Sequence, residues 1–257
     1  MKRLFDKKTR NLLHQAFNQA DERVRDDYSQ GYIVDENDYT SNLCMEVRKM
    51  LSNSSFPHVT LHSQKLPPSQ ERQYGCDACL ILIDHNLNRG KICMFEAKAN
   101  TSRWDYLDKK KQFSHFSTQL ARQQLALSKG FAVWEQFYTK APNGVRVGNR
   151  NATGSTCISG FNARRHNGKH PNNIVWTDSD IDTLALQQRA KYSSMGSLVE
   201  RVCECVQGKP KNIDFIKQFL QENLKVNNLL IVQSGSKYQI NDIVQAVPIS
   251  VSSGPEA

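Results

Sequence analysis

Two stretches near the start of the chain carry apolar residues at helical spacing. Residues 3–28 are rich in charge and place apolar side chains loosely every three or four positions, which predicts an amphipathic helix that covers the core. Residues 36–51 carry a more regular apolar stripe, which consists of Tyr39, Leu43, Val47 and Met50. This stripe predicts a second helix with one buried face. Asp35 or Asn37 is expected to cap its first turn.

Three strand patterns follow the second helix. Residues 58–63 alternate apolar and polar side chains, and the proline pair at 67–68 ends the strand. Residues 77–84 and 91–98 are two apolar runs joined by the polar segment HNLNRG, whose final glycine suits a turn. The two runs therefore predict a β-hairpin.

A helix and a further strand complete this part of the chain. Apolar residues keep the helical period over residues 105–128, and Gly130 is expected to end that helix. Residues 131–138 are rich in β-branched and aromatic side chains, which favour a strand. Between residues 36 and 138 the predicted order is therefore helix, strand, strand, strand, helix, strand.

The C-terminal part has weaker patterns. Residues 140–172 are irregular and basic, 174–178 resemble a short strand, and helices are expected over about 180–206 and 211–225 before a strand at 229–233. We expect a single domain over residues 1–257, with a core at 36–138, an N-terminal helix at 3–28, an embellishment at 140–247 and a tail at 248–257.

The composition is that of an ordinary folded protein with a basic surface. Hydrophobic residues make up 39% of the chain and charged residues 23%, which excludes a disordered or fibrous class. The net charge of +9 favours a polyanionic partner such as nucleic acid. The sequence contains no stretch that approaches the roughly 18 apolar residues of a membrane helix. It also contains no glycine-rich phosphate loop, so ATP use is not expected. Seven cysteines, an odd number, and the lack of an apolar signal sequence predict a soluble cytoplasmic protein.

The predicted hairpin carries the residues with the clearest chemistry. Glu96 and Lys98 are two positions apart on one strand, so both side chains lie on the same face. If HNLNRG forms the loop, Asp84 opposes Lys91. In that register Asp77 opposes Lys98 and lies diagonally from Glu96. Diagonal neighbours are about 7–8 Å apart at the backbone, which lets two carboxylates converge on one cation.

A pair of carboxylates with water suits a hard cation such as Mg²⁺ or Mn²⁺, and the Lys98 ammonium would position or help to deprotonate an attacking water. The alternative is that these charges decorate a solvent-exposed strand face. The neighbouring sequence argues against it, because Asp77 begins an apolar run and Glu96 follows the apolar ICMF. An enclosed carboxylate is costly unless it binds an ion or a partner.

Asp77, an 18-residue spacer and the sequence EAK at 96–98 together resemble the motif of the PD-(D/E)xK nuclease superfamily. The sequence GCD at 75–77 stands in place of the proline of that name and is similar to a variant of many restriction-like members. The superfamily order of helix, three strands, helix and strand matches residues 36–138. The resemblance implies an α/β fold with a restriction-endonuclease-like core, in which a mixed central sheet is flanked by helices. It also implies Mg²⁺, replaceable by Mn²⁺, held by Asp77, Glu96 and the backbone carbonyl of Ala97.

The resemblance further implies an acidic residue on the first core helix and a glutamine on the second. Glu36 at the helix start is the expected carboxylate and Glu46 is its competitor, although the helix dipole alone also favours a glutamate in the first turn. Gln119 is the expected glutamine and Gln123 lies one turn later, although a surface glutamine is ordinary on an amphipathic helix. His115 is close by, but a lone histidine on a half-buried helix is usually structural.

Clusters of basic residues predict where a substrate backbone would lie, although such runs are often simply solvated. The expected contacts are Lys109 and Lys110, with Lys111, at the start of the second core helix, and Arg164, Arg165 and Lys169 in a mobile loop. We therefore expect a Mg²⁺-dependent DNA endonuclease of a restriction, defence or mobile-element type. Duplex cutting by one site per chain would imply a homodimer. The alternatives are a non-catalytic nucleic-acid-binding protein on the same fold and a junction- or RNA-directed nuclease.

Overall fold

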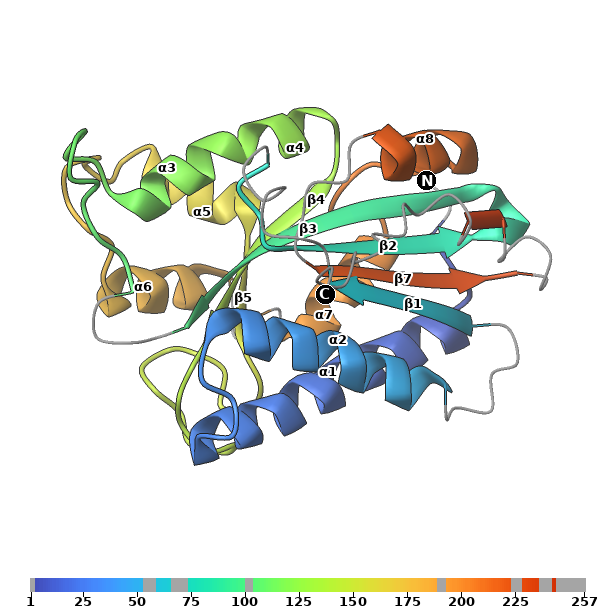
Figure 1. Ribbon diagram of the computed structural model, residues 1–257, viewed down its shortest axis with the longest axis horizontal. Coiled ribbons are helices and arrows are strands. Elements are labelled where there is room, and N and C mark those ends of the chain that lie inside the picture. The colour runs from blue at the N-terminus through green and yellow to red at the C-terminus, as the bar shows by residue number, and fades with distance from the viewer. Residues whose placement is uncertain are drawn as a thin grey trace, which may run out of the picture.

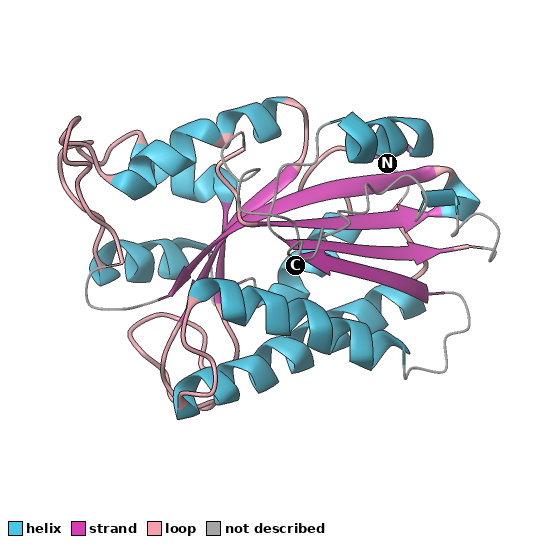
Figure 2. Ribbon diagram, in the orientation of Figure 1, coloured by secondary structure: helices cyan, strands magenta, loops and turns pink. Residues whose placement is uncertain are grey.

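A computed structural model describes residues 3–52, 59–65, 74–99, 104–188, 193–222, 228–235 and 242–243. Within these ranges the chain forms an α/β fold, in which an open mixed β-sheet has helices on both faces (Figure 1). Figure 2 shows the strands running between two helical layers. This confirms the predicted α/β class with a mixed sheet flanked by helices. Among the helices described here, none is long and apolar enough to cross a membrane.

The sheet has the spatial strand order β1-β7-β2-β3-β4-β5, with β6 paired to β3. The strands are β1 (Val59–Lys65), β2 (Ala78–Asp84), β3 (Arg89–Ala99), β4 (Ala132–Tyr138), β5 (Thr156–Ser159), β6 (Lys211–Asn212) and β7 (Asn228–Ser234). β3 pairs antiparallel with β2 and parallel with β4, whereas β7 runs parallel to β2 and antiparallel to β1. β7, which the sequence pattern assigned to an embellishment, therefore lies inside the sheet between β1 and β2.

The helices form two layers and a cluster at the end of the sheet. They are α1 (Lys7–Gln30), α2 (Glu36–Ser52), α3 (His115–Arg122), α4 (Gln124–Ser128), α5 (Gly160–Asn167), α6 (Asp178–Gln188), α7 (Met195–Cys203) and α8 (Ile213–Glu222). The apolar residues of α1, α2 and α7 pack on one face of the sheet, and those of α4 and α8 pack on the other. A third apolar cluster joins α3, α5 and α6 to β4 and β5.

Side chains along β3 alternate between the two layers. Phe95 and Ala97 pack with α1 and α2, whereas Met94 packs on the opposite face with α8. This period of two is that of a strand buried on both faces. Glu96 and Lys98 therefore leave β3 on the face opposite to α1 and α2.

The elements predicted between residues 36 and 138 are present in the predicted order, as α2, β1, β2, β3, α3 and β4. The helix predicted at 3–28 is also present, as α1. At the start of α2 the Asp35 Oδ1 atom accepts a hydrogen bond from the Asp38 amide at 2.8 Å. Asp35, and not Asn37, therefore caps this helix.

The register of the β2–β3 hairpin differs from its prediction by two residues. Asp84 pairs with Arg89 rather than with Lys91, because the turn is a short 3-10 helix, His85–Leu87, and β3 begins earlier than expected. The Asp84 side chain caps this turn, and Asn88 closes it with a φ of 49° in the left-handed region.

A shift of two residues keeps every side chain on its predicted face, since strand side chains alternate with a period of two. Glu96 and Lys98 therefore stay on one face. Ala78 pairs with Phe95, so the register continued by one position opposes Asp77 to Glu96 and not to Lys98. The structure brings the two carboxylates closer in register than the sequence analysis expected.

The helix predicted over 105–128 begins later than expected. Residues 104–114 form a loop, and α3 begins only after Ser114, whose Oγ atom accepts a hydrogen bond from the Ser117 amide at 3.0 Å. Lys109 and Lys110 therefore lie before this helix rather than at its start. Gly130 follows α4 with a φ of 81°, as expected for a residue that closes a helix.

Several predictions for the C-terminal part are wrong. Residues 140–172 contain β5 and α5, so Arg164 and Arg165 lie on a helix and not in a loop. Residues 174–178 are not a strand, and α6 begins at Asp178. The helix expected over 180–206 is two helices, α6 and α7. The tail at 248–257 lies outside the described residues.

Candidate active site

Glu96 and Lys98 form the buried centre of the candidate site. The Lys98 Nζ atom lies 2.6 Å from Glu96 Oε1. Glu96 is 1% exposed and Lys98 is 8% exposed, so this ion pair is largely withdrawn from solvent. Because both residues leave β3 on the same face, the period of the strand accounts for their contact.

Asp77 precedes β2 and joins the site through the backbone of β3. Its Oδ2 atom accepts a hydrogen bond from the Ala97 amide at 2.9 Å, and its own amide donates to Phe95 O at 2.9 Å. On its other side, the amide of Asn228 in β7 donates to Asp77 O at 3.2 Å. Neighbouring strands on both sides therefore hold Asp77 beside the β3 backbone.

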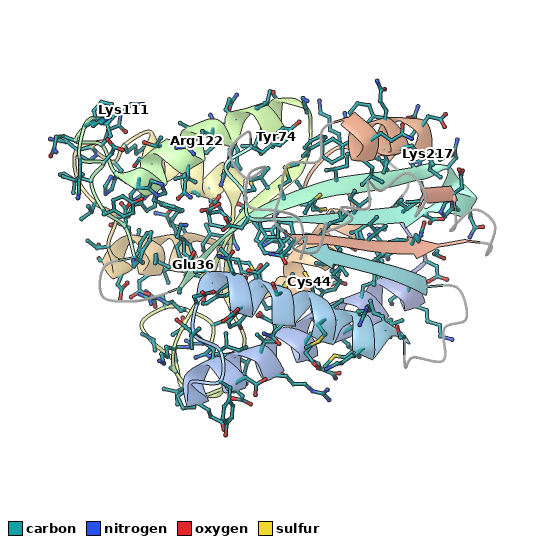
Figure 3. The ribbon with its side chains drawn as sticks, viewed as in Figure 1. Glu36, Cys44, Tyr74, Lys111, Arg122 and Lys217 are labelled. Carbon is teal, nitrogen blue, oxygen red and sulfur yellow. The ribbon has the colours of Figure 1, made fainter. Side chains whose placement is uncertain are left out.

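Of the two glutamates considered on the first core helix, the structure brings Glu36 to the site. Its Oε2 atom lies 3.5 Å from Lys98 Nζ. Figure 3 shows Glu36 at the N-terminal end of α2. Glu46, in contrast, pairs with Lys49 at 2.7 Å and with Arg23 at 3.6 Å. The start of α2 therefore reaches the end of β3, while Glu46 has other partners.

The two glutamines considered on the second core helix contact different carboxyl groups. The Gln119 Nε2 atom donates to Glu96 Oε1. Gln123 follows α3 and is fully buried, and its Nε2 atom donates to Glu135 Oε2 at 3.1 Å and to Gly75 O at 3.2 Å. Gln119 thus braces Glu96, and Gln123 links β4 to the segment that leads into Asp77.

Glu135 is a site residue that the sequence analysis missed. It is fully buried in β4 and is the direct register partner of Glu96 in β3. A signal for it was available in the sequence, because Glu135 interrupts the apolar run FAVW in the same way as Glu96 follows ICMF. A carboxyl group inside such a run needs a partner or an ion.

Burial and charge set the pKa values of these groups. Burial raises the pKa of Glu96 well above its usual range, against the effect of Lys98 and with the added repulsion of Asp77. Burial likewise raises the pKa of Glu135 to about 8. Burial alone would lower the pKa of Lys98, but the charges of the surrounding carboxylates, Glu96 first, outweigh it and raise that pKa. The lysine is therefore an ammonium group among the carboxyl groups.

The cluster contains more acidic groups than its ammonium can balance. Four carboxyl groups, those of Glu36, Asp77, Glu96 and Glu135, lie within electrostatic reach of Lys98. Three buried oxygens in the same region, Gln119 Oε1, Gln123 Oε1 and Glu135 Oε1, have no hydrogen-bond partner. Crowded carboxyl groups, which a cation would help to ionise, and unpaired oxygens are surroundings that suit a hard divalent cation.

The donor set therefore fits Mg²⁺ or Mn²⁺, which use carboxylate, carbonyl and water oxygens. No ready-made group of three or more His, Cys, Asp or Glu ligands is found in the part of the chain that the structure describes. A metal ion here would accordingly need ligands beyond the side chains of Asp77 and Glu96. The carbonyl of Ala97 and water molecules are of the right type.

The predicted basic contacts lie on two neighbouring elements. Lys109 and Lys110 are exposed in the loop before α3, and Figure 3 shows Lys111 at the outer end of that loop. Arg164 and Arg165 belong to α5, which packs against α3, and exposed Lys169 follows that helix. Basic residues from distant parts of the sequence are thus brought to the same end of the molecule.

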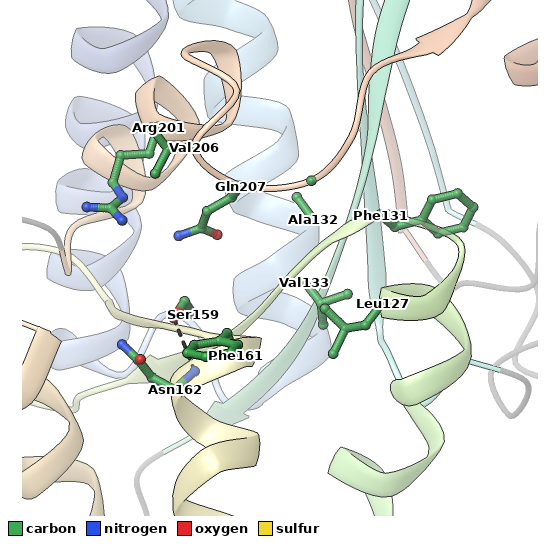
Figure 4. A pocket seen from close by; sticks show the side chains of 11 residues that line it. Leu127, Phe131, Ala132, Val133, Ser159, Phe161, Asn162, Arg201, Val206 and Gln207 are labelled. Carbon is green, nitrogen blue, oxygen red and sulfur yellow. Dashed lines mark hydrogen bonds between the residues drawn. The ribbon is translucent and has the colours of Figure 1, made fainter. Parts of the chain in front are cut away.

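A pocket of about 340 Å³ lies at the N-terminal end of β4 (Figure 4). Its lining joins apolar side chains, among them Val133 and Phe161, to the polar side chains of Arg201 and Gln207. The pocket lies toward the opposite end of β4 from Tyr138 and includes none of the carboxyl groups around Lys98. It is therefore separate from the candidate active site.

Three comparisons with known proteins were negative: no family model, no curated protein and no solved structure matches this chain.

Proposed function

We propose that this chain is a metal-dependent nuclease that hydrolyses phosphodiester bonds, with DNA as its substrate and endonucleolytic cutting as its mode. The observation that carries the proposal is that half-buried Asp77, bound to the Ala97 amide, lies beside the buried ion pair of Glu96 and Lys98. Binding nucleic acid does not require buried carboxylates facing a phosphate, because without a metal ion they would repel it. The basic net charge supports a polyanionic substrate.

In this proposal Asp77, Glu96 and the Ala97 carbonyl would hold Mg²⁺, with Mn²⁺ as a substitute. When bound, the ion would neutralise charge on the scissile phosphate and lower the pKa of a water molecule. Lys98 would orient that water, whose oxygen bonds to phosphorus and whose proton passes to bulk water. The bond from phosphorus to the leaving sugar oxygen would break at the same time, and that oxygen would take a proton from water. The Lys98 ammonium would also offset the charge that develops on the phosphate oxygens.

The other groups of the site would position Glu96 and Lys98. Gln119 holds the Glu96 carboxylate from the side of α3, and Glu36 holds Lys98 from the side of α2. These contacts restrict the rotation of the Glu96 and Lys98 side chains. Such restriction would favour catalysis, because the reacting groups are already in position.

We also propose that α2, β1, β2, β3, α3 and β4 form a restriction-endonuclease-like core. The order of these elements and the position of the Asp77, Glu96 and Lys98 set on a hairpin support it. β7 adds a parallel neighbour to β2 within that arrangement. A restriction, defence or mobile-element role, a cytoplasmic location and a homodimer that cuts both strands belong to the same proposal.

One cleavage experiment tests the proposed activity. Purified protein is incubated with supercoiled plasmid, linear duplex, single-stranded DNA and RNA, in Mg²⁺ or in EDTA, beside Lys98→Ala and Asp77→Asn variants. We expect Mg²⁺-dependent cleavage of DNA that falls by about 100-fold or more in both variants. Glu46→Gln is the matched control on α2 and should cut at the wild-type rate.

Three outcomes would count against the proposal in different ways. Binding without cleavage of any substrate by the wild-type protein would favour the alternative of a non-catalytic nucleic-acid-binding protein. Cleavage at full rate by Lys98→Ala would leave the activity in place but refute the assigned site. Cleavage of RNA alone would move the substrate to the alternative of an RNA-directed nuclease.

A further inference from the structure

The loop of residues 104–114, ahead of α3, folds as a short hairpin. Leu107 and Ser114 form an antiparallel bridge, and the Asp108 amide donates to Phe113 O at 2.7 Å. The exposed tip consists of Lys109, Lys110 and Lys111. Asp108 Oδ1 accepts hydrogen bonds from the amides of Lys110 and Lys111 at 2.9 and 2.8 Å. The three lysines are therefore presented on a formed turn.

A single buried carboxylate fixes the base of this hairpin. Asp105 is 6% exposed and accepts three hydrogen bonds, from Ser114 Oγ at 2.7 Å, from the Phe116 amide at 2.9 Å and from the Trp176 amide at 2.8 Å. These contacts join the hairpin to α3 and to the segment before α6. Ligand contacts at the hairpin would therefore not require the ordering of a free loop.

The hairpin also carries two aromatic side chains that lie largely in solvent. Tyr106 is 54% exposed and Phe113 is 47% exposed. The Tyr106 ring stacks on the His115 ring, with centroids 4.7 Å apart and planes at 12°. One face of Tyr106 is thus braced by a neighbouring ring, although aromatic side chains usually gain stability by burial.

His115 connects this surface to the candidate active site. It is the first residue of α3, and Gln119, one turn later on the same helix face, contacts Glu96. Burial lowers the pKa of His115, and the charge of Lys98 adds to the shift, which places the two side chains within electrostatic reach.

We propose that Tyr106 and Phe113, with Lys109, Lys110 and Lys111, bind an unpaired polynucleotide strand and lead it to the carboxylate cluster. The proposal rests on the nuclease function and names its substrate class as nucleic acid with a single-stranded segment beside the scissile bond. Aromatic rings that stack on bases, combined with lysines that track the phosphates, are the means by which proteins hold single strands. In a duplex the base faces are covered by their neighbours, so the rings would have nothing to stack on.

Binding is measured by fluorescence anisotropy in EDTA with four labelled probes: single-stranded DNA, single-stranded RNA, blunt duplex DNA and duplex DNA with a single-stranded overhang. We expect Tyr106→Ala and Phe113→Ala each to weaken binding of the single-stranded and overhang probes by about 10-fold. Blunt-duplex binding should change less than about 2-fold. Tyr106→Phe keeps the ring and should bind like the wild type. Comparison of the single-stranded DNA and RNA probes shows which of the two nucleic acids the surface prefers.

Phe215→Ala is the matched control. Phe215 is also partly exposed, at 37%, and has Lys211 Nζ 4.8 Å from its ring centroid, but it lies on α8, far from the hairpin (Figure 1). Loss of single-strand binding in this variant too would indicate a nonspecific effect and overturn the proposal. Replacing Lys109, Lys110 and Lys111 by alanine should weaken the binding of every probe and reduce the dependence of affinity on salt concentration.

The same proteins are then tested for cleavage in Mg²⁺, so that the two proposals fail separately. Unchanged single-strand binding and cleavage in Tyr106→Ala, beside an active wild type, would overturn the strand-binding surface and leave the nuclease standing. If the wild-type protein cleaves nothing, and the Tyr106→Ala variant binds single strands more weakly than the wild type, the nuclease proposal is overturned and the strand-binding surface is kept. A wild type that binds none of the four probes would overturn the surface.

Discussion

Glu96 and Glu135 face each other as register partners on the parallel strands β3 and β4, and both are buried. Lys98 and Gln119 contact Glu96, whereas Gln123 contacts Glu135. Two buried carboxyl groups on paired positions resist ionising together, since the charge of Glu135 disfavours that of Glu96. The pair therefore makes the site sensitive to any change in charge on either strand.

The first prediction concerns Glu135 and pH. Its folded-state pKa of about 8 lies above its ordinary value of 4.5, so its neutral form stabilises the fold fully below pH 4.5, and this stability is lost as the pH rises through about 8. Glu135→Gln removes that loss. In EDTA, we expect urea unfolding to show the variant gaining stability over wild type between pH 5 and pH 9, by at most about 5 kcal/mol. Parallel pH profiles for the two proteins would contradict this.

The second prediction compares the two glutamates of α2. Glu36→Gln removes a carboxylate that holds Lys98, so the cleavage rate should fall by about 10- to 100-fold. Glu46→Gln should leave the rate unchanged, because Glu46 pairs with Lys49 and Arg23. Single-turnover rates in Mg²⁺ measure both. Equal losses in the two variants would show that the effect comes from α2 stability and not from the contact with Lys98.

The third prediction concerns metal binding without catalysis. A cation bound only by the folded state stabilises it, by about 2.7 kcal/mol at a hundredfold excess over its Kd. We therefore expect Mg²⁺ to raise the Tm by about 5–10 °C, and the rise to vanish in Asp77→Asn. Differential scanning calorimetry at constant ionic strength is the measurement. A Mg²⁺ shift of full size in Asp77→Asn would remove Asp77 from the ligand set.

The fourth prediction uses two glycines with positive φ. At Gly75, φ +62°, an added Cβ would lie 2.9 Å from Gln119 O and 3.1 Å from Arg122 Cβ. At Gly144, φ +84°, nothing lies within 4 Å. Either alanine costs about 1–2 kcal/mol of backbone strain, but only Gly75→Ala should also slow cleavage, because it pushes α3 away from Asp77. Equal cleavage by the two variants, at matched folded fractions, would rule out that displacement.

The face of the hairpin could be predicted from sequence, whereas its register could not. Alternation on β3 is a local property, so Glu96 and Lys98 were placed together correctly. The register depends on whether residues 85–88 form a turn or extend the strands. The Asp84 side chain decides in favour of the turn, because it accepts hydrogen bonds from the Asn86 and Leu87 amides. The pattern of apolar residues does not indicate these side-chain hydrogen bonds.

The other differences have similar physical causes. Phe113 kept the helical period, yet it lies outside α3, because Ser114 caps the helix and Asp105 binds the turn. The strand carrying Glu135 was predicted, but its place beside β3 is a parallel pairing between segments separated in sequence. The insertion of β7 between β1 and β2 is also nonlocal. The continuous apolar run at 229–232 is typical of a strand buried on both faces, but it does not show which strands lie beside it.

The position of β7 affects when the surroundings of Asp77 can be completed during synthesis. A growing chain that has already released Asp77, Glu96 and Lys98 from the ribosome still has an open edge on β2, because the strand that pairs there is made far later. Pairing over such a sequence separation is slow and leaves that edge available to other chains in the meantime. The amide of Asn228 that holds Asp77 arrives with the same strand. Asp77 therefore gains its contact with the Asn228 amide only after residues 228–234 have been made, well after the residues that carry the carboxylate cluster.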